Sequence, residues 1–227
     1  MPGELLTFNR IAVFCSALVY WGGVLVQARR VRKRIGRSPN VRPKGLKEKL
    51  LWAGWSFVVL AWMALPLMSG SIHAGWWQIA SGLLHPLATI TGIVMLIAGY
   101  AGTLACYLAM GGAWRMGIDR KTKADLITTG PYRFVRHPIY LFQLLMVAAI
   151  PVLLPSFPAL LVLIVHLICV VIKARDEETY LRTVLGEPYQ LYCGSSGRWL
   201  PKFSSDKFAS STAKPPDHLK PAEPQLH

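Results

Sequence analysis

Long apolar stretches alternate with short polar and charged segments along the chain. The first three apolar stretches run from about residue 11 to 28, from 50 to 68 and from 87 to 110. Each approaches the ~20 residues that a helix needs to cross the ~30 Å hydrocarbon core of a bilayer. Residues 1–110 are therefore predicted to contain three transmembrane helices.

A fourth apolar stretch, from residue 139 to 172, is much too long for one untilted crossing at ~1.5 Å per helical residue. The prolines that interrupt it near its middle are Pro151, Pro155 and Pro158. The pattern predicts a helical hairpin of residues 138–154 and 158–172, with both open ends on one side of the membrane. The predicted fold class is thus all-α, a polytopic membrane bundle of five transmembrane helices.

The net charge of +14 comes from basic residues that cluster between the apolar stretches. The densest cluster lies in residues 29–49, and the positive-inside rule predicts that this loop is cytoplasmic. The N-terminus and residues 69–78, which contain no Lys or Arg, are then outside, and the basic segments after residues 110 and 172 are cytoplasmic. The C-terminus is predicted to be cytoplasmic too. Such loops attract anionic lipid head groups, which we favour over nucleic acid because the basic residues adjoin apolar spans.

Composition supports a membrane protein, since hydrophobic residues make up 53% of the chain and charged residues only 16%. The cysteines form no CxxC pair and no metal spacing with histidine, so we expect reduced thiols and no bound metal. Residues 203–227 are rich in Ser, Pro and Lys and are predicted to be a disordered tail. A multi-pass protein of this kind fits a bacterial inner membrane or an endoplasmic reticulum.

Small side chains mark one face of the third apolar stretch. Ala98 and Gly102 are four residues apart, which places them on the same face of a helix. Small residues at this spacing let a second helix approach closely in a membrane. We therefore expect this face to pack against another helix.

The most unusual polar sequence is GPYRFVRHPIY, residues 130–140, at the start of the predicted hairpin. Two prolines favour a non-helical segment that ends where Pro138 begins a helix. Arg136 and His137 then lie at a helix N-terminus, whose free N–H groups suit a carboxylate or phosphate.

The hairpin also brings its two open ends together. Arg136, His137 and Tyr140 are expected to face Arg175, Glu177 and Glu178, a set of charges that could bind a zwitterion. The other interpretation is that these residues are interfacial anchors and surface ion pairs, which contribute little energetically.

The order of these residues resembles a known family. The pattern comprises Gly130, Tyr132, Arg136, His137, Pro138 and Tyr140, then Glu177, Glu178 and Leu181, then Gly186, Tyr189 and Tyr192. It is similar to the isoprenylcysteine carboxyl methyltransferase and phospholipid methyltransferase superfamily of integral-membrane enzymes. The resemblance covers roughly residues 111–200.

The resemblance implies that residues 111–202 form the catalytic half, with a cytosol-facing pocket for S-adenosylmethionine. The residues it implies for cofactor binding are Tyr132, Arg136, His137, Tyr140, Glu177 and Glu178. Arg136 and His137 could hold the methionine carboxylate, while a glutamate accepts hydrogen bonds from the amino group or ribose. The catalytic candidates are Arg175, which could orient a carboxylate acceptor, and Glu178, which could take a proton from an amine or thiol.

The implied function is isoprenylcysteine carboxyl methyltransferase-like methylation of a lipophilic or small acceptor at the membrane–cytoplasm interface. Two alternative activities are N-methylation of a phospholipid amine and S-methylation of a thiol. A second class is an NADPH-dependent sterol or isoprenoid reductase, whose C-terminal region is similar. The third is a non-catalytic membrane scaffold.

Overall fold

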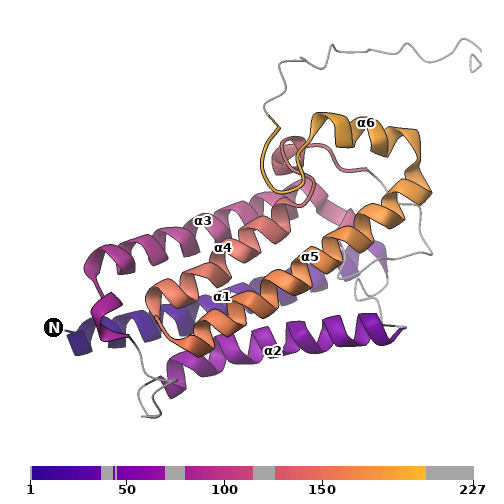
Figure 1. Ribbon diagram of the computed structural model, residues 1–227. Helices are drawn as coiled ribbons and strands as arrows, with labels where there is room; N and C mark the ends of the chain where they lie inside the picture. The colour runs from indigo at the N-terminus through magenta and orange to yellow at the C-terminus, as the bar shows by residue number, and fades with distance from the viewer. Residues whose placement is uncertain (1, 37–42, 44, 70–79, 115–125, 203–227) are drawn as a thin grey trace, which may run out of the picture.

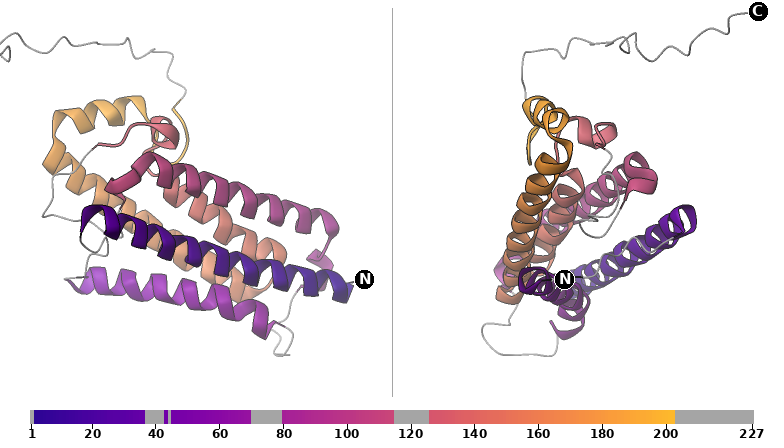
Figure 2. Two further views of the ribbon diagram at one scale, coloured as in Figure 1. Left: turned by 180° about the vertical axis from the view of Figure 1, so that it is seen from behind. Right: turned by 90° about the vertical axis from the view of Figure 1, so that its right-hand side faces the viewer.

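The computed structural model describes residues 2–36, 43, 45–69, 80–114 and 126–202. In these ranges the regular structure is helical apart from one isolated β-bridge, which confirms the predicted all-α class. The α-helices are α1 (Pro2–Ile35), α2 (Leu46–Met68), α3 (Pro86–Met110), α4 (Pro138–Leu153), α5 (Phe157–Leu185) and α6 (Glu187–Ser195). Figures 1 and 2 show α1–α5 together in one bundle, with α6 at one end. The predicted tail, residues 203–227, and most of the three longer loops lie outside the described residues.

The apolar pattern located the membrane helices correctly. Helices α1, α2, α3 and α5 are long and apolar enough to cross a membrane, and α4 is a shorter apolar helix. The predicted hairpin is confirmed, because α4 ends at Leu153, three residues form the turn, and α5 begins at Phe157. The number of crossings and the orientation of the termini stay predictions.

Helices α1 and α5 are longer than predicted. Helix α1 spans Pro2–Ile35 rather than residues 11–28, so it includes the first residues of the predicted basic loop. The hairpin's second helix does not end at residue 172, because α5 continues for 29 residues to Leu185. At residue 173 the sequence changes from apolar to charged, so the helix surface that suited lipid now suits water. This change does not interrupt the helical backbone. The helix ends at Gly186, whose φ of 59° lies in the left-handed region that favours glycine. The last turns of α5 therefore hold the charged residues that follow residue 172, and the short helix α6 comes after them.

Helices α3 and α4 pack closely through glycines. A Cβ atom at Gly92 would overlap Leu153, one at Gly99 would overlap Met146, and one at Gly102 would overlap the Phe142 ring. The predicted small-residue face therefore exists, but Ala98 does not belong to it, because its side chain is exposed. The contact face repeats every seven residues, from Gly92 to Gly99, because two helical turns return nearly to the same direction.

Buried polar contacts attach α1 to the rest of the bundle. Asn9 Nδ2 donates a hydrogen bond of 2.9 Å to the Leu153 carbonyl oxygen, and Asn9 Oδ1 accepts one of 3.0 Å from Thr89 Oγ1. Farther along α1, Ser16 Oγ accepts a hydrogen bond of 3.0 Å from Trp62 Nε1 of α2. These bonds satisfy polar atoms that have no water partner inside a membrane protein.

The glycine packing predicts a sharp difference between two alanine substitutions. Gly99→Ala should destabilise the protein by about 1–3 kcal/mol, because the new methyl group overlaps α4. Gly22→Ala is the matched control, since no atom lies within 4 Å of a Cβ built there on α1, and it should be neutral or slightly stabilising. Thermal unfolding in detergent measures both, and equal melting temperatures would contradict the packing described here.

Candidate functional site

The open end of the hairpin brings the two predicted motif segments together. Tyr140 Oη of α4 donates a hydrogen bond of 2.6 Å to Glu177 Oε1 of α5. His137 precedes α4, its Nδ1 lies 3.8 Å from Glu177 Oε2, and its ring stacks on Tyr140 with centroids 5.7 Å apart. The juxtaposition expected from the hairpin is therefore present for these three side chains.

The local sequence explains how this segment turns into α4. Gly130 has a φ of 58°, and residues Gly130–Arg133 form a 3₁₀ turn rather than the wholly non-helical segment expected. Tyr132 in this turn is buried, and its hydroxyl donates to Met110 Sδ at 2.8 Å. Pro138 then occupies the first turn of α4, where its missing N–H costs nothing.

Glu178, one residue after Glu177, is the centre of an ion-pair cluster. Its side chain is buried, and Oε1 accepts hydrogen bonds from Arg136 Nε at 3.1 Å and Arg198 Nε at 2.9 Å. Oε2 accepts a bond of 2.5 Å from Arg198 Nη2, and the Arg182 guanidinium lies 3.9 Å away. His137 Nε2 is 3.3 Å from Oε1. We call these five residues the Glu178 cluster.

Arg136 extends this cluster to the segment after α6. Its Nη1 donates to the Ser196 carbonyl at 2.5 Å and to the Cys193 carbonyl at 3.3 Å. Its backbone N–H donates to the Gly197 carbonyl at 2.7 Å, and Gly197 N–H donates to the Phe134 carbonyl at 3.1 Å. The motif segment and the residues after α6 therefore form one unit around Glu178.

The charges of the cluster set its protonation. Glu178 lies beyond the apolar part of α5, and burial alone would raise its pKa. Interactions with His137, Arg198 and Arg136 outweigh burial, so the pKa of this carboxyl is well below its usual range. The hydrogen bonds from Arg198 to Glu178 raise the pKa of Arg198 in turn. The pair is fully ionised at physiological pH.

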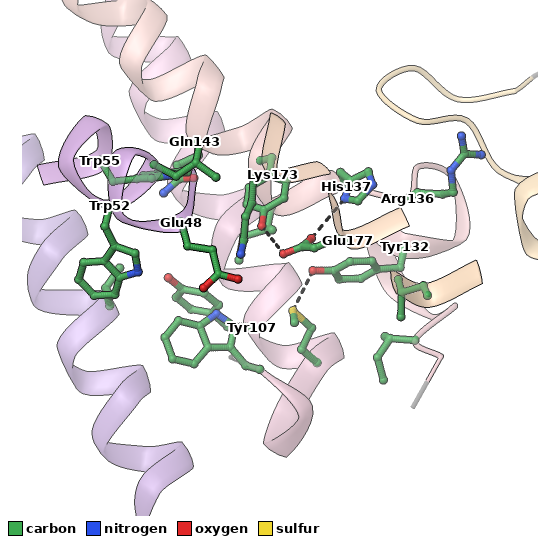
Figure 3. A pocket seen from close by; sticks show the side chains of 18 of the residues that line it. Glu48, Trp52, Trp55, Tyr107, Tyr132, Arg136, His137, Gln143, Lys173 and Glu177 are labelled. Carbon is green, nitrogen blue, oxygen red and sulfur yellow. Dashed lines mark hydrogen bonds and ion pairs between the residues drawn. The ribbon is translucent and has the colours of Figure 1, made fainter. Parts of the chain in front are cut away.

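A cavity of about 380 Å³ lies beside the cluster (Figure 3). The predicted residues that line it are Tyr132, Arg136, His137, Tyr140 and Glu177. Glu178 does not line it, because its carboxylate faces the arginines, and Arg175 lies exposed on α5 outside the lining. Lys173, one helical turn before Glu177, is the α5 cation that does line the cavity.

Sequence reasoning missed a second wall of the cavity, which α1 and α2 build. This wall includes Tyr20, Trp21, Val24, Glu48, Leu51, Trp52, Trp55, Ser56 and Val59. No motif marks these residues, and only the packing of the bundle brings them to the site. Arg198 was also missed, because it was counted only among the basic residues that predict the orientation in the membrane.

Tyr189 of α6 belongs to the sequence pattern but had been given no role. Its side chain is 1% exposed, it lines the cavity, and its hydroxyl has no hydrogen-bond partner among the described residues. A buried hydroxyl without a partner costs free energy, so this atom suits a ligand in the cavity. Tyr192, on the same face of α6, is instead satisfied by the Tyr132 carbonyl at 2.6 Å.

The arrangement can bind a cation among aromatic rings. Tyrosine and tryptophan rings surround the cavity and Glu177 supplies a negative charge, which together favour a positively charged ligand group. In the part of the chain that the structure describes, no group of His, Cys, Asp and Glu side chains could hold a metal ion.

The Glu178 cluster predicts a specific acid sensitivity. Because the folded pKa is depressed, the stabilisation is complete above the ordinary carboxyl value of 4.5 and is lost as the pH falls below it. Glu178→Gln should cost on the order of 3 kcal/mol at pH 7, since it leaves the buried Arg136 without its partner. The substitution should also remove part of the further loss of folding stability between pH 5 and pH 3.

Thermal unfolding in detergent at pH 7 and pH 3 tests this, with Glu187→Gln on the exposed start of α6 as the matched control. The control should unfold as the wild type does at both pH values. An unchanged melting temperature for Glu178→Gln at pH 7 would contradict the proposed dependence on the cluster.

Comparison with known proteins gives one family match, which lies in the C-terminal part of the chain. Residues 87–188, from α3 to the start of α6, match the family model described as phospholipid methyltransferase. Helices α1 and α2 lie outside this match, and no curated protein matches the chain. Residues 87–188, which contain the motif, the hairpin and the glutamate pair, are therefore similar to the phospholipid methyltransferases, a family in the superfamily of integral-membrane methyltransferases that also includes the isoprenylcysteine carboxyl methyltransferases.

Proposed function

We propose that the protein methylates the amine head group of a phospholipid, with S-adenosylmethionine as methyl donor. The observation that carries this proposal is the cavity of about 380 Å³, which is lined both by motif residues of α4 and α5 and by an aromatic wall from α1 and α2. One end of the cavity has the residues of the matched family segment, and the other end faces helices suited to lipid. A donor and a lipophilic acceptor could therefore meet inside it.

The donor fits the end of the cavity near α6. We propose that Glu177 accepts hydrogen bonds from the amino group and the ribose of the donor. His137, Tyr140 and the Tyr189 hydroxyl, which has no partner among the described residues, would make further hydrogen bonds to it. Arg136 is committed to Glu178 and two carbonyl oxygens, so we assign it a positioning role. Glu178, first considered as a cofactor-binding and catalytic residue, receives the same role.

S-adenosylmethionine supplies an electrophilic methyl group on a positively charged sulfur. The protein's part is to align an acceptor with that methyl group and to stabilise positive charge as it moves. Aromatic rings such as Tyr132 and Tyr140 and the carboxylate of Glu177 suit both tasks. No covalent intermediate with the protein is needed.

The charges of the cavity favour an amine over a carboxylate acceptor. Arg175 is exposed outside the cavity and Arg136 already pairs with Glu178, so Lys173 is the cavity cation that could orient a carboxylate. The Glu48 and Glu177 carboxylates line the same cavity and would repel a carboxylate acceptor. An amine arrives as an ammonium ion and must lose a proton, which a carboxylate such as Glu177 or Glu48 can accept. Amine methylation thus replaces the isoprenylcysteine-type reaction as the preferred activity.

The active site is proposed to face the cytoplasm. The basic end of α1 carries Arg32, Lys33 and Arg34 in its last turn, and the positive-inside rule assigns this end to the cytoplasm. The same end of the bundle holds the first turn of α2, since Lys47 contacts Asp176 of α5 next to Glu177.

Calorimetric titration of the purified protein in detergent tests the cofactor assignment. We expect micromolar binding of S-adenosylmethionine and its demethylated product, and no binding of NADPH. Glu177→Gln should weaken the binding of both molecules by about 10- to 100-fold, because it removes a hydrogen bond to a charged group. Glu187→Gln should leave both affinities unchanged. Binding of NADPH alone would indicate the reductase class. If the folded protein bound none of these three molecules, the result would indicate the non-catalytic scaffold.

Transfer of a labelled methyl group tests the acceptor. With labelled S-adenosylmethionine, we expect label in phosphatidylethanolamine and none in a farnesylated cysteine carboxylate or a small alkyl thiol. Label in the carboxylate or the thiol instead would overturn the amine proposal while leaving the methyltransferase class intact.

A further inference from the structure

The α1–α2 wall of the cavity contains a polar atom that the bundle leaves unsatisfied. Trp21 lines the cavity, and its Nε1 is buried with no hydrogen-bond partner among the described residues. Its ring packs against the neighbouring Tyr20 ring in a T-shaped contact, with centroids 5.1 Å apart. A buried donor without an acceptor costs about 1–3 kcal/mol, so this atom points to an oxygen of a ligand.

The depth of Trp21 indicates which part of a ligand it meets. It lies eight residues before Arg29, or about 12 Å along α1, and therefore within the apolar stretch. Apolar side chains of the same wall, Val24 and Val59, line the cavity around this level. An oxygen that reaches this depth must belong to a mostly apolar molecule, such as the ester group of a lipid.

Opposite charges line the cavity near the first turn of α2. Glu48 in the first turn of α2 and Lys173 of α5 both line the cavity, and Figure 3 shows the Glu48 and Glu177 carboxylates turned toward the same open space. Lys47 Nζ lies 2.5 Å from Asp176 Oδ1, so this ion pair joins α2 to α5 one residue before each cavity-lining glutamate. Glu48 and Glu177 therefore line one cavity from two different helices.

We propose that Trp21, Glu48 and Lys173 form the acceptor subsite for a zwitterionic phospholipid, and this rests on the proposed function. Glu48 holds the ammonium group and Lys173 the phosphate, while the Trp21 N–H donates to an ester oxygen. Trp52 and Trp55, one and two turns after Glu48, border the path between head group and ester. Two of the three subsite residues, Trp21 and Glu48, thus stand on α1 and α2, which lie outside residues 87–188.

Two substitutions of the same kind separate a ligand contact from a structural role. Trp21→Phe removes a donor that has no partner, so the melting temperature without lipid should not fall, while KM for phosphatidylethanolamine should rise about fivefold. Trp62→Phe is the matched control, because its N–H bonds Ser16 and it does not line the cavity. It should lower the melting temperature and leave KM unchanged.

A second pair tests the charges. Glu48→Gln should raise KM for phosphatidylethanolamine about tenfold and leave the affinity for the demethylated cofactor unchanged, whereas Glu187→Gln should change neither. Equal losses of acceptor and cofactor affinity would place Glu48 in the cofactor half and overturn the subsite. Unchanged KM in both Trp21→Phe and Glu48→Gln would overturn it as well.

Binding measured without turnover distinguishes this proposal from the proposed function. Acyl-labelled fluorescent phosphatidylethanolamine should bind the wild type in detergent more tightly than the phosphatidylglycerol analogue, and Glu48→Gln should abolish the preference. Equal binding of both lipids by the wild type would overturn the subsite. Preferential binding without methyl transfer would support the subsite and overturn only the proposed reaction.

Discussion

The buried carboxylate of Glu178 is the interaction on which the rest of the site depends. It pairs with Arg136 from the motif segment and with Arg198 from the segment after α6, while it stands on α5 itself. A buried charge is tolerated only when its partners are in place, so these three parts of the chain must fold together. Glu177, the next residue back, is turned by about 100° on the helix and faces the cavity instead. The adjacent glutamates therefore have different surroundings, one among the arginines and the other at the cavity.

The bundle around the site combines tight and loose packing. Helices α3 and α4 approach closely because Gly92, Gly99 and Gly102 leave room for larger side chains of α4. The wall of α1 and α2 is instead built from large rings such as Trp21, Trp52 and Trp55, and the cavity lies between this wall and the hairpin. Close packing on one side holds the motif residues in place, and the bulky wall leaves space for a ligand.

The sequence allowed the helices, the hairpin and the meeting of Tyr140 with Glu177 to be predicted, because apolar length and proline positions are local signals. It did not distinguish Glu177 from Glu178, since which of two adjacent carboxylates faces the arginines depends on the rotation of α5. Nor did it identify Glu48 or Trp21, whose place at the cavity follows only from how α1 and α2 pack. Arg175 was favoured by its position before the glutamate pair, but helical geometry turns it outward.

The short length of α4 has a consequence for the surrounding membrane. Its 16 residues span about 24 Å, less than the ~30 Å thickness of a typical hydrocarbon core, whereas α3 has 25 residues. Such hydrophobic mismatch is relieved when the bilayer thins around the shorter element. Thinning beside the hairpin would bring the lipid head groups of the two leaflets closer together at the protein than elsewhere. The bilayer next to α4 would then be deformed, and the work of lifting a phospholipid from its leaflet toward the cavity would be smaller there.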